Sequence, residues 1–317
     1  MNFWSKLKQP FFILAPMANV TDAAFRRLIA KYGKPDVLYT EFVSADGLCS
    51  RGKEKLLVDL LYAKKERPIV AQIFGANPEK IYEASALIKK LGFDGLDINM
   101  GCPDRTVEKQ GAGAALMKNP KLARQIIRAA KDGAKGLPIS IKTRIGYNKN
   151  EIDTWLPELL AEKPAAIIIH ARTRKEMSKV PAHWGVITQA VAIANGSGVL
   201  IIGNGDVKSI EEGRRLAKET GADGIMIGRG IFGNPWMFSK KNWAKISLPA
   251  KLKALVEHTK LFEKLLGQAK NFNIMKKHYA AYVSGFSGAK ELRGRLMAAK
   301  NAAEVETIIK AALTEKF

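Results

Sequence analysis

The segment Asp94–Asp104, DGLDINMGCPD, holds the residues whose types and spacing are most suggestive of chemistry. A short apolar stretch, Gly95–Ile98, runs into Asn99 and then into Gly-Cys-Pro at 101–103. Glycine and proline on either side of Cys102 predict a tightly fixed thiol where a strand becomes a loop. In parallel α/β proteins, reactive groups gather at this end of the strands. The thiol is therefore a candidate proton donor or nucleophile, and the competing interpretation is a cysteine that only packs there.

The net charge of the chain is +22 over 317 residues. Such an excess favours a polyanionic partner, with nucleic acid ahead of an anionic membrane surface. General solubility is the competing interpretation. The sequence has no basic amphipathic anchor, no lipidation motif and no apolar run near the roughly 18 residues that a membrane span needs. We therefore expect a nucleic-acid partner and no membrane association.

The cysteine content and the N-terminus bear on the compartment. Two cysteines, Cys49 and Cys102, form neither a disulfide framework nor a CxxC metal pair, which is typical of a reducing cytoplasm. The opening residues MNFWSKLKQP contain no long apolar core, so no signal peptide is expected. We predict a cytoplasmic protein, and packing is the expected role of Cys49.

Residues 11–240 alternate between short apolar runs and amphipathic stretches of helical period. Eight runs are predicted as strands: Phe12–Ala15, Val37–Thr40, Ile69–Gln72, Gly95–Ile98, Ile139–Lys142, Ala166–His170, Val199–Ile202 and Gly224–Ile227. Predicted helices between them include Pro78–Leu91, Pro120–Ala130 and Ser209–Thr220. Eight strand–helix units in about 230 residues predict an α/β fold of the (β/α)8 TIM-barrel type. A doubly wound sheet is the alternative.

From about residue 245 the strand pattern stops. Four helices are predicted, over Leu248–Leu266, Asn273–Ser284, Ala289–Ala299 and Ala302–Leu313. Residues 241–317 contain 15 Lys and Arg against 6 Glu, a net charge of +9. We therefore predict a barrel domain over residues 1–242 and a small, basic, all-helical C-terminal domain over residues 243–317.

The predicted strand ends form a candidate active site. The last two strands run into Gly203-Asn204-Gly205-Asp206 and Gly228-Arg229-Gly230. The loops after these strands commonly bind phosphate in barrels, where glycine lets backbone N–H groups approach an anion. Tight turns alone are the competing interpretation for one loop, whereas two such loops in this order favour a phosphate site.

Lys142, Gln72 and His170 add polar groups at other strand ends. A lysine at a buried strand end is costly unless an anion accompanies it. A flavin ring offers a polar edge that a lysine and an amide can bind. A core histidine and a strand-end amide are the competing interpretations for His170 and Gln72. The residues together favour FMN over a metal, since His170 and His183 lack the spacing of a metal pair.

These residues resemble the tRNA-dihydrouridine synthase family. The resemblance rests on LAPMANVTDAAFRRL, VAQIFGANPE, DGLDINMGCP followed by VEKQGAGAALM, ISIKTRIGYN, IIIHARTR, IIGNGDV, GADGIMIGRGIFGNPW and KKHYAAYVSGFSGAKELRGRL. It covers about residues 12 to 300, and the NMGCP, GNGD and IGRG pieces in this order are highly specific.

The resemblance implies roles for individual residues. Cys102 would be the general acid, Asn99 and Arg144 would hold the uracil edge, and Arg172 would contact either phosphate or base. FMN would be held by Pro16, Met17, Gln72, Lys142, His170, Asn204, Gly205, Asp206, Gly228 and Arg229. One departure concerns a base-stacking contact, because Ser178 stands near a position where the family usually has an aromatic residue.

The implied reaction is the reduction of specific tRNA uridines to 5,6-dihydrouridine. FMN, reduced by NADPH or NADH, would pass a hydride from N5 to uracil C6, and Cys102 would protonate C5. The uridine would leave its stack to reach the flavin, and the basic tail would hold the tRNA backbone. No obligatory protein partner and a monomer are expected. Which uridines are reduced is left open.

Two rival functions remain at this point. Another FMN barrel, such as a dihydroorotate or dihydropyrimidine dehydrogenase, would share the phosphate loops and the lysine without needing a basic tail. A non-catalytic tRNA-binding protein would need the tail without Cys102, Lys142 or His170. The presence of both sets favours the synthase.

Overall fold

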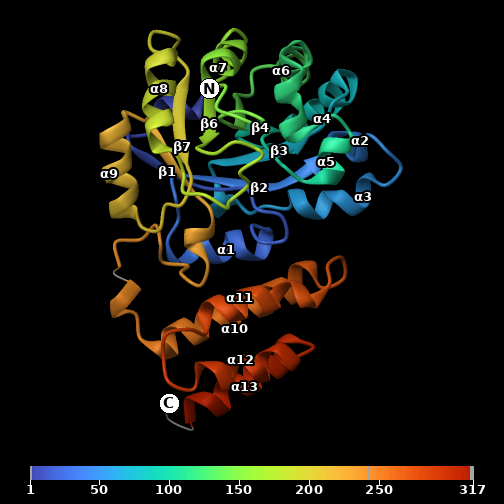
Figure 1. Cartoon of the computed structure of the whole chain (residues 1–317). Helices are drawn as coiled ribbons and strands as arrows, with labels where there is room; N and C mark the ends of the chain where they lie inside the picture. Colours follow the sequence, from blue (N-terminus) through green and yellow to red (C-terminus); the bar gives the residue numbers. More distant parts are fainter. Residues whose placement is uncertain (1, 242, 315–317) are drawn as a thin grey trace.

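A closed barrel of eight parallel strands forms the centre of the molecule (Figure 1). The computed structural model describes residues 2–241 and 243–314. The strands are β1 (Phe11–Leu14), β2 (Val37–Ser44), β3 (Ile69–Phe74), β4 (Gly95–Met100), β5 (Ile139–Arg144), β6 (Ala166–His170), β7 (Leu200–Asn204) and β8 (Gly224–Ile227). They neighbour one another in chain order, and β1 pairs with β8 to close the ring. The predicted (β/α)8 TIM barrel is confirmed.

Helices cover the outside of the barrel. They are α1 (Ala23–Tyr32), α2 (Ala45–Leu48), α3 (Lys53–Leu56), α4 (Pro78–Lys90), α5 (Arg105–Lys109), α6 (Pro120–Ala134), α7 (Ile152–Leu160), α8 (Trp184–Ala194) and α9 (Ile210–Thr220). Asn77 and Asn119 cap α4 and α6, each followed by a proline at the first helical position, where no N–H is needed. Gly221 ends α9 in the left-handed conformation.

Two apolar layers hold the barrel. Alternate strand residues such as Ile13, Val70 and Ile168 point into the barrel and form its interior core. The other strand faces and the inner faces of the helices form a larger core around the outside. Because both faces of each strand are buried, the strands are nearly continuous apolar runs.

The C-terminal helices lie beneath the barrel in Figure 1, beside α1. They are α10 (Leu248–Leu266), α11 (Lys276–Tyr282), α12 (Ala289–Ala298) and α13 (Ala302–Thr314). Their buried residues form a core that also takes in Ala24 and Leu28 of α1 and Trp236. The predicted helical C-terminal region is confirmed, while the division at 242 and 243 stays a prediction, and residue 242 lies outside the described residues.

Several predicted ends were wrong, because β2, β3, β4, β5, β7 and α6 each continue two to four residues beyond the predicted end. The second strand continues beyond Thr40 to Ser44, with an irregular register between Tyr39 and Phe42. Glu41 interrupts the apolar run, but its carboxylate accepts hydrogen bonds from distant partners, so the strand tolerates it. The single helix expected over Asn273–Ser284 is a short 3-10 turn, Phe272–Met275, followed by α11.

Candidate active site

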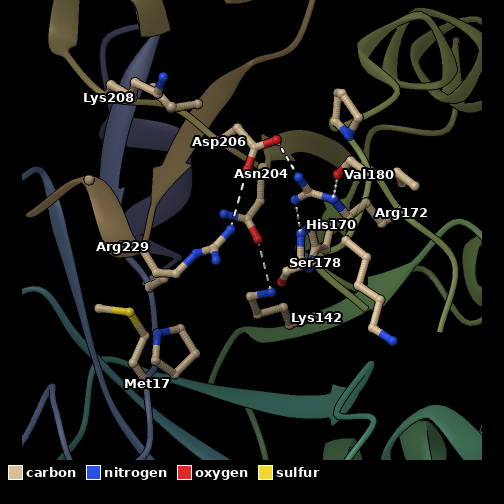
Figure 2. A pocket seen from close by; sticks show the side chains of 18 residues that line it. Met17, Lys142, His170, Arg172, Ser178, Val180, Asn204, Asp206, Lys208 and Arg229 are labelled. Atoms are coloured by element: carbon tan, nitrogen blue, oxygen red, sulfur yellow. Dashed lines mark hydrogen bonds and ion pairs between the residues drawn. The ribbon is translucent and has the colours of Figure 1, made fainter. Parts of the chain in front are cut away.

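A cavity of about 840 Å³ opens at the C-terminal end of the barrel. Figure 2 shows its polar side chains converging from several strand ends. Ten of the fourteen predicted site residues line it: Pro16, Met17, Lys142, His170, Arg172, Asn204, Gly205, Asp206, Gly228 and Arg229. Its size is that of a typical small-molecule or cofactor site. The strand order of the barrel thus brings together residues separated by more than 200 positions in the sequence.

The two glycine-rich loops lie against each other at one side of the cavity. A Cβ on Gly230 would lie 2.4 Å from the carbonyl oxygen of Val207, so no larger residue fits there. Gly205 has a φ of +138°, and a Cβ on it would lie 2.7 Å from Cβ of Ala182. Glycine at these two positions therefore lets the loops pack closely against Val207 and Ala182 beside the cavity.

Arg172 joins the loops around the cavity from a buried position. Its Nε donates to the carbonyl oxygen of Val180 at 2.6 Å, and a terminal nitrogen lies 3.1 Å from Nε2 of His170. The guanidinium also forms an ion pair with Asp206. Burial alone raises the pKa of Asp206, but Arg172 and the Ala182 amide more than offset this and lower it. Arg172 therefore orients His170 and Asp206. The contact with phosphate or base that the family resemblance implies for Arg172 stays a prediction.

His170 is held as a neutral ring. Burial lowers its pKa far below the ordinary value, and the cations Lys142, Arg144 and Arg172 add to the shift. Because a guanidinium only donates hydrogen bonds, Nε2 of His170 must accept from Arg172. The ring proton therefore lies on Nδ1, which makes His170 a donor through that nitrogen.

Lys142 and Asn204 form a second pair at the floor of the cavity (Figure 2). Nζ of Lys142 donates to Oδ1 of Asn204 at 3.2 Å, while Nδ2 of Asn204 donates to the Met226 carbonyl at 2.8 Å. Burial and, next, repulsion from Arg144 lower the pKa of Lys142 to about 8. With Arg229 exposed at the rim, the cavity is rich in cations and suits an anionic ligand.

Cys102 follows β4, next to the strand that carries Lys142. Oδ1 of Asn99 accepts hydrogen bonds from the amides of Gly101 at 3.1 Å and Cys102 at 2.9 Å. Burial raises the pKa of the Cys102 thiol, so the thiol keeps its proton at neutral pH. A protonated thiol on a fixed loop is suited to donate a proton.

Arg144 is buried behind this loop. Its Nε donates to the Gly101 carbonyl at 2.9 Å, and one terminal nitrogen donates to the carbonyls of Thr173 and Met177, both at 3.0 Å. Arg144 therefore ties the cysteine loop to the segment after β6. Ser178, where an aromatic residue was expected, lines the cavity together with Lys179, Val180 and Pro181.

Gln72 lies deeper than its predicted role required, since its side chain is fully buried. Its Nε2 donates to Oδ2 of Asp97 at 2.7 Å, and its Oε1 accepts from Nδ2 of Asn99 at 3.0 Å. Sequence reasoning missed Asp97. The signal was available, because a charged residue inside an apolar strand is rarely buried without partners.

The closed eight-stranded barrel, with its cavity at the carboxyl ends of the strands, places the protein in the TIM-barrel class of enzymes. The glycine-rich loops and clustered cations make this cavity a pocket for an anionic ligand. The family model described as "Dihydrouridine synthase (Dus)" matches residues 13–317, and the chain belongs to this family. The resemblance found in the sequence is thereby confirmed.

Two relatives with similar sequences agree with this assignment. The chain is 41% identical over 313 residues to the "Probable tRNA-dihydrouridine synthase" of Staphylococcus aureus (strain COL), covering 97% of this chain and 94% of that protein. It is also 41% identical to the "Probable tRNA-dihydrouridine synthase 2" of Bacillus subtilis (strain 168), with 97% and 95% covered.

Among solved structures, a morphinone reductase shares the fold with a TM-score of 0.55 at 11% identity, over 76% of this chain and 87% of that chain. A histamine dehydrogenase from Rhizobium sp. 4-9 has a TM-score of 0.56 at 12% identity, over 79% and 48%. These likenesses show the barrel fold. Within residues 2–241 and 243–314, no helix could cross a membrane and no metal-binding cluster of His, Cys, Asp or Glu occurs.

Proposed function

We propose that this protein reduces uridines in tRNA to 5,6-dihydrouridine, using FMN and a nicotinamide dinucleotide as reductant. The observation that carries the proposal is the cationic cavity, lined by ten predicted site residues. Cys102 follows β4, the strand that pairs with β5, which carries the cavity residue Lys142. Membership of the dihydrouridine synthase family and the relatives named as tRNA enzymes support it.

The cavity fits FMN in size and in the kind of groups it presents. The close-packed loops at Gly205 and Gly230, with Arg229, would hold the phosphate. Lys142 would face the edge of the flavin ring that becomes negative on reduction. Nδ1 of His170 would donate a hydrogen bond to the flavin. When bound and reduced by NADPH or NADH, FMN supplies the hydride that uracil C6 accepts.

The chain's own residues complete the reduction. Cys102 transfers its thiol proton to C5 of uracil, so that hydride and proton together saturate the C5–C6 bond. Asn99 and Arg144 hold the loop that presents the thiol. Arg172 keeps His170 and Asp206 in place.

The predicted basic C-terminal region, residues 243–317, would bind the tRNA backbone. Lys253, Lys264, Lys277 and Lys290 are exposed on its helices. Phosphate contacts from lysines position an RNA without reading its sequence. A monomer working in the cytoplasm, with no obligatory protein partner, is consistent with this arrangement.

The test is mass spectrometry of tRNA lacking dihydrouridine after incubation with the protein, FMN and NADPH. New dihydrouridine is expected, and its position would define the specificity. Bound FMN and NADPH oxidation without this product would favour a flavin dehydrogenase acting on a free pyrimidine. Absence of bound flavin would overturn the site and leave tRNA binding as the function.

A further inference from the structure

A buried carboxylate, Asp97, lies beneath the cavity in the barrel interior and is fully inaccessible to solvent. The strand register places it beside Gln72 of β3 on one side and Ser140 of β5 on the other. Oγ of Ser140 donates to its Oδ1 at 2.6 Å, and the hydroxyl of Tyr39 lies 3.0 Å from that Oγ. Its other oxygen, Oδ2, accepts from Gln72.

These contacts form one hydrogen-bond chain with a single possible polarity. The amides of Gly101 and Cys102 are donors, so the side-chain atom of Asn99 that faces them must be its oxygen. The nitrogen of Asn99 then faces Gln72, whose oxygen must accept. The nitrogen of Gln72 consequently faces Asp97, which must accept in turn.

We propose that Asp97 is a positioning residue that fixes the cysteine loop through Gln72 and Asn99. Without the Asp97 carboxylate to accept from its nitrogen, the Gln72 amide could rotate by half a turn. Asn99 would then lose the Gln72 oxygen that keeps its own oxygen directed at the cysteine loop. The inference rests on the proposed role of Cys102 as proton donor, and it adds a residue outside the cavity to that site.

The environment of Asp97 is consistent with this role. Burial raises its pKa to about 7, even though Ser140, Gln72 and the charge of Lys142 lower it. Because burial removes this carboxylate from water, it does not stabilise the fold as an apolar side chain would. Its best-supported use is to specify one arrangement of its partners.

The test measures alkylation of Cys102 by iodoacetamide, resolved by peptide mass spectrometry, with Cys49 in the same molecule as internal reference. Asp97→Ala removes the acceptor, and the rate ratio of Cys102 to Cys49 is expected to rise about fivefold as the loop loosens. Asp97→Asn offers Gln72 a carbonyl oxygen and is expected to stay within about twofold of the wild type.

Ser140→Ala is the matched control. It removes a buried hydrogen bond to the same carboxylate but leaves the hydrogen bonds through Gln72 and Asn99 intact. The ratio of the Cys102 to the Cys49 alkylation rate should therefore not change. Should Asp97→Ala fail to fold, Gln72→Met breaks the same chain with little change in volume and should give the same rise. A ratio equal to wild type in a folded chain-breaking variant, or an equal rise in Ser140→Ala, would overturn the proposal.

Turnover separates this inference from the proposed function. In Asp97→Ala at saturating FMN, uridine reduction should fall about tenfold with the KM for tRNA unchanged, while the oxidation of NADPH should fall much less. A wild-type protein that makes no dihydrouridine would contradict the proposed function alone. The alkylation ratios would still decide whether Asp97 positions the loop.

Discussion

Lys270, in the turn after α10, forms an ion pair with Glu41 on β2 of the barrel. The distance from Nζ to Oε2 is 2.5 Å, and Asp59 approaches the same nitrogen at 2.6 Å. Oε1 of Glu41 accepts a hydrogen bond from the amide of Asn19, in the loop between β1 and α1. The same loop contains Met17, which lines the cavity. The C-terminal helices are thus bonded to the segment that borders the active site.

Replacing Lys270 by Met should destabilise the protein by about 3–5 kcal/mol, because it leaves the nearly buried carboxylate of Glu41 without its cation. Urea denaturation measures the free energy of unfolding. The control is Arg215→Ala, which breaks the exposed pair with Glu219 and should cost less than about 1 kcal/mol. Equal effects of the two variants would contradict the importance of the buried pair.

The affinity for FMN should fall as pH rises above about 8. Burial lowers the pKa of Lys142 to this value, so the free site loses its charge above it. A bound anion favours the protonated form and raises that pKa, so binding takes up a proton. The dissociation constant should then rise by up to about tenfold per pH unit. Quenching of flavin fluorescence between pH 7 and 9.5 measures it.

Lys142→Met serves as the control for this profile. The variant should bind FMN more weakly below pH 8 and show no step near that pH. A step of the same size in both proteins would assign the titration to another group.

Cys102→Ala should lower the rate of uridine reduction by about 10²- to 10⁴-fold, the usual contribution of a general acid. Oxidation of NADPH by the flavoprotein should stay near the wild-type rate, because that half-reaction needs no proton at C5. Cys49→Ser is the control and should retain both rates. Stopped-flow absorbance and dihydrouridine analysis measure the two steps. Undiminished uridine reduction in Cys102→Ala would rule out the assigned role.

Gly230→Ala should destabilise the fold by about 1–3 kcal/mol, because its Cβ would lie 2.4 Å from the Val207 carbonyl oxygen and the backbone would have to shift. Weaker FMN binding should accompany this loss. Gly294→Ala on α12 meets open space and should be neutral or stabilising by up to about 1 kcal/mol. Thermal unfolding of both variants makes the comparison. A Gly230→Ala protein as stable as wild type would show that the two loops can separate.

The affinity for tRNA should fall steeply with salt, because the net charge of +22 points to backbone contacts. We expect at least a tenfold loss between about 50 and 200 mM salt if several lysines contact phosphates. Filter binding or fluorescence anisotropy measures it. Affinity that does not depend on salt would mean that the basic surface is not the tRNA site.

Local patterns carried much of the prediction. Each of the eight strands was found within one residue of its observed start, because apolar runs and their flanking turns depend on neighbouring residues. The helix starts at Pro78 and Pro120 were correct for the same reason. The extension of β2 through Glu41 was missed, since its partners Lys270 and Asn19 lie elsewhere in the chain.

By itself, the sequence determined the barrel, the helical C-terminal region, the two glycine-rich loops and the thiol at a strand end. These features depend on residue types at short spacing, where period and turn chemistry act. Only the tertiary structure decided that Arg172 holds His170 and Asp206, and that Gln72 joins Asp97 to Asn99. Such contacts depend on which strands become neighbours and in what register. That information appears only when the barrel closes and burial drives most polar groups to pair with a neighbour.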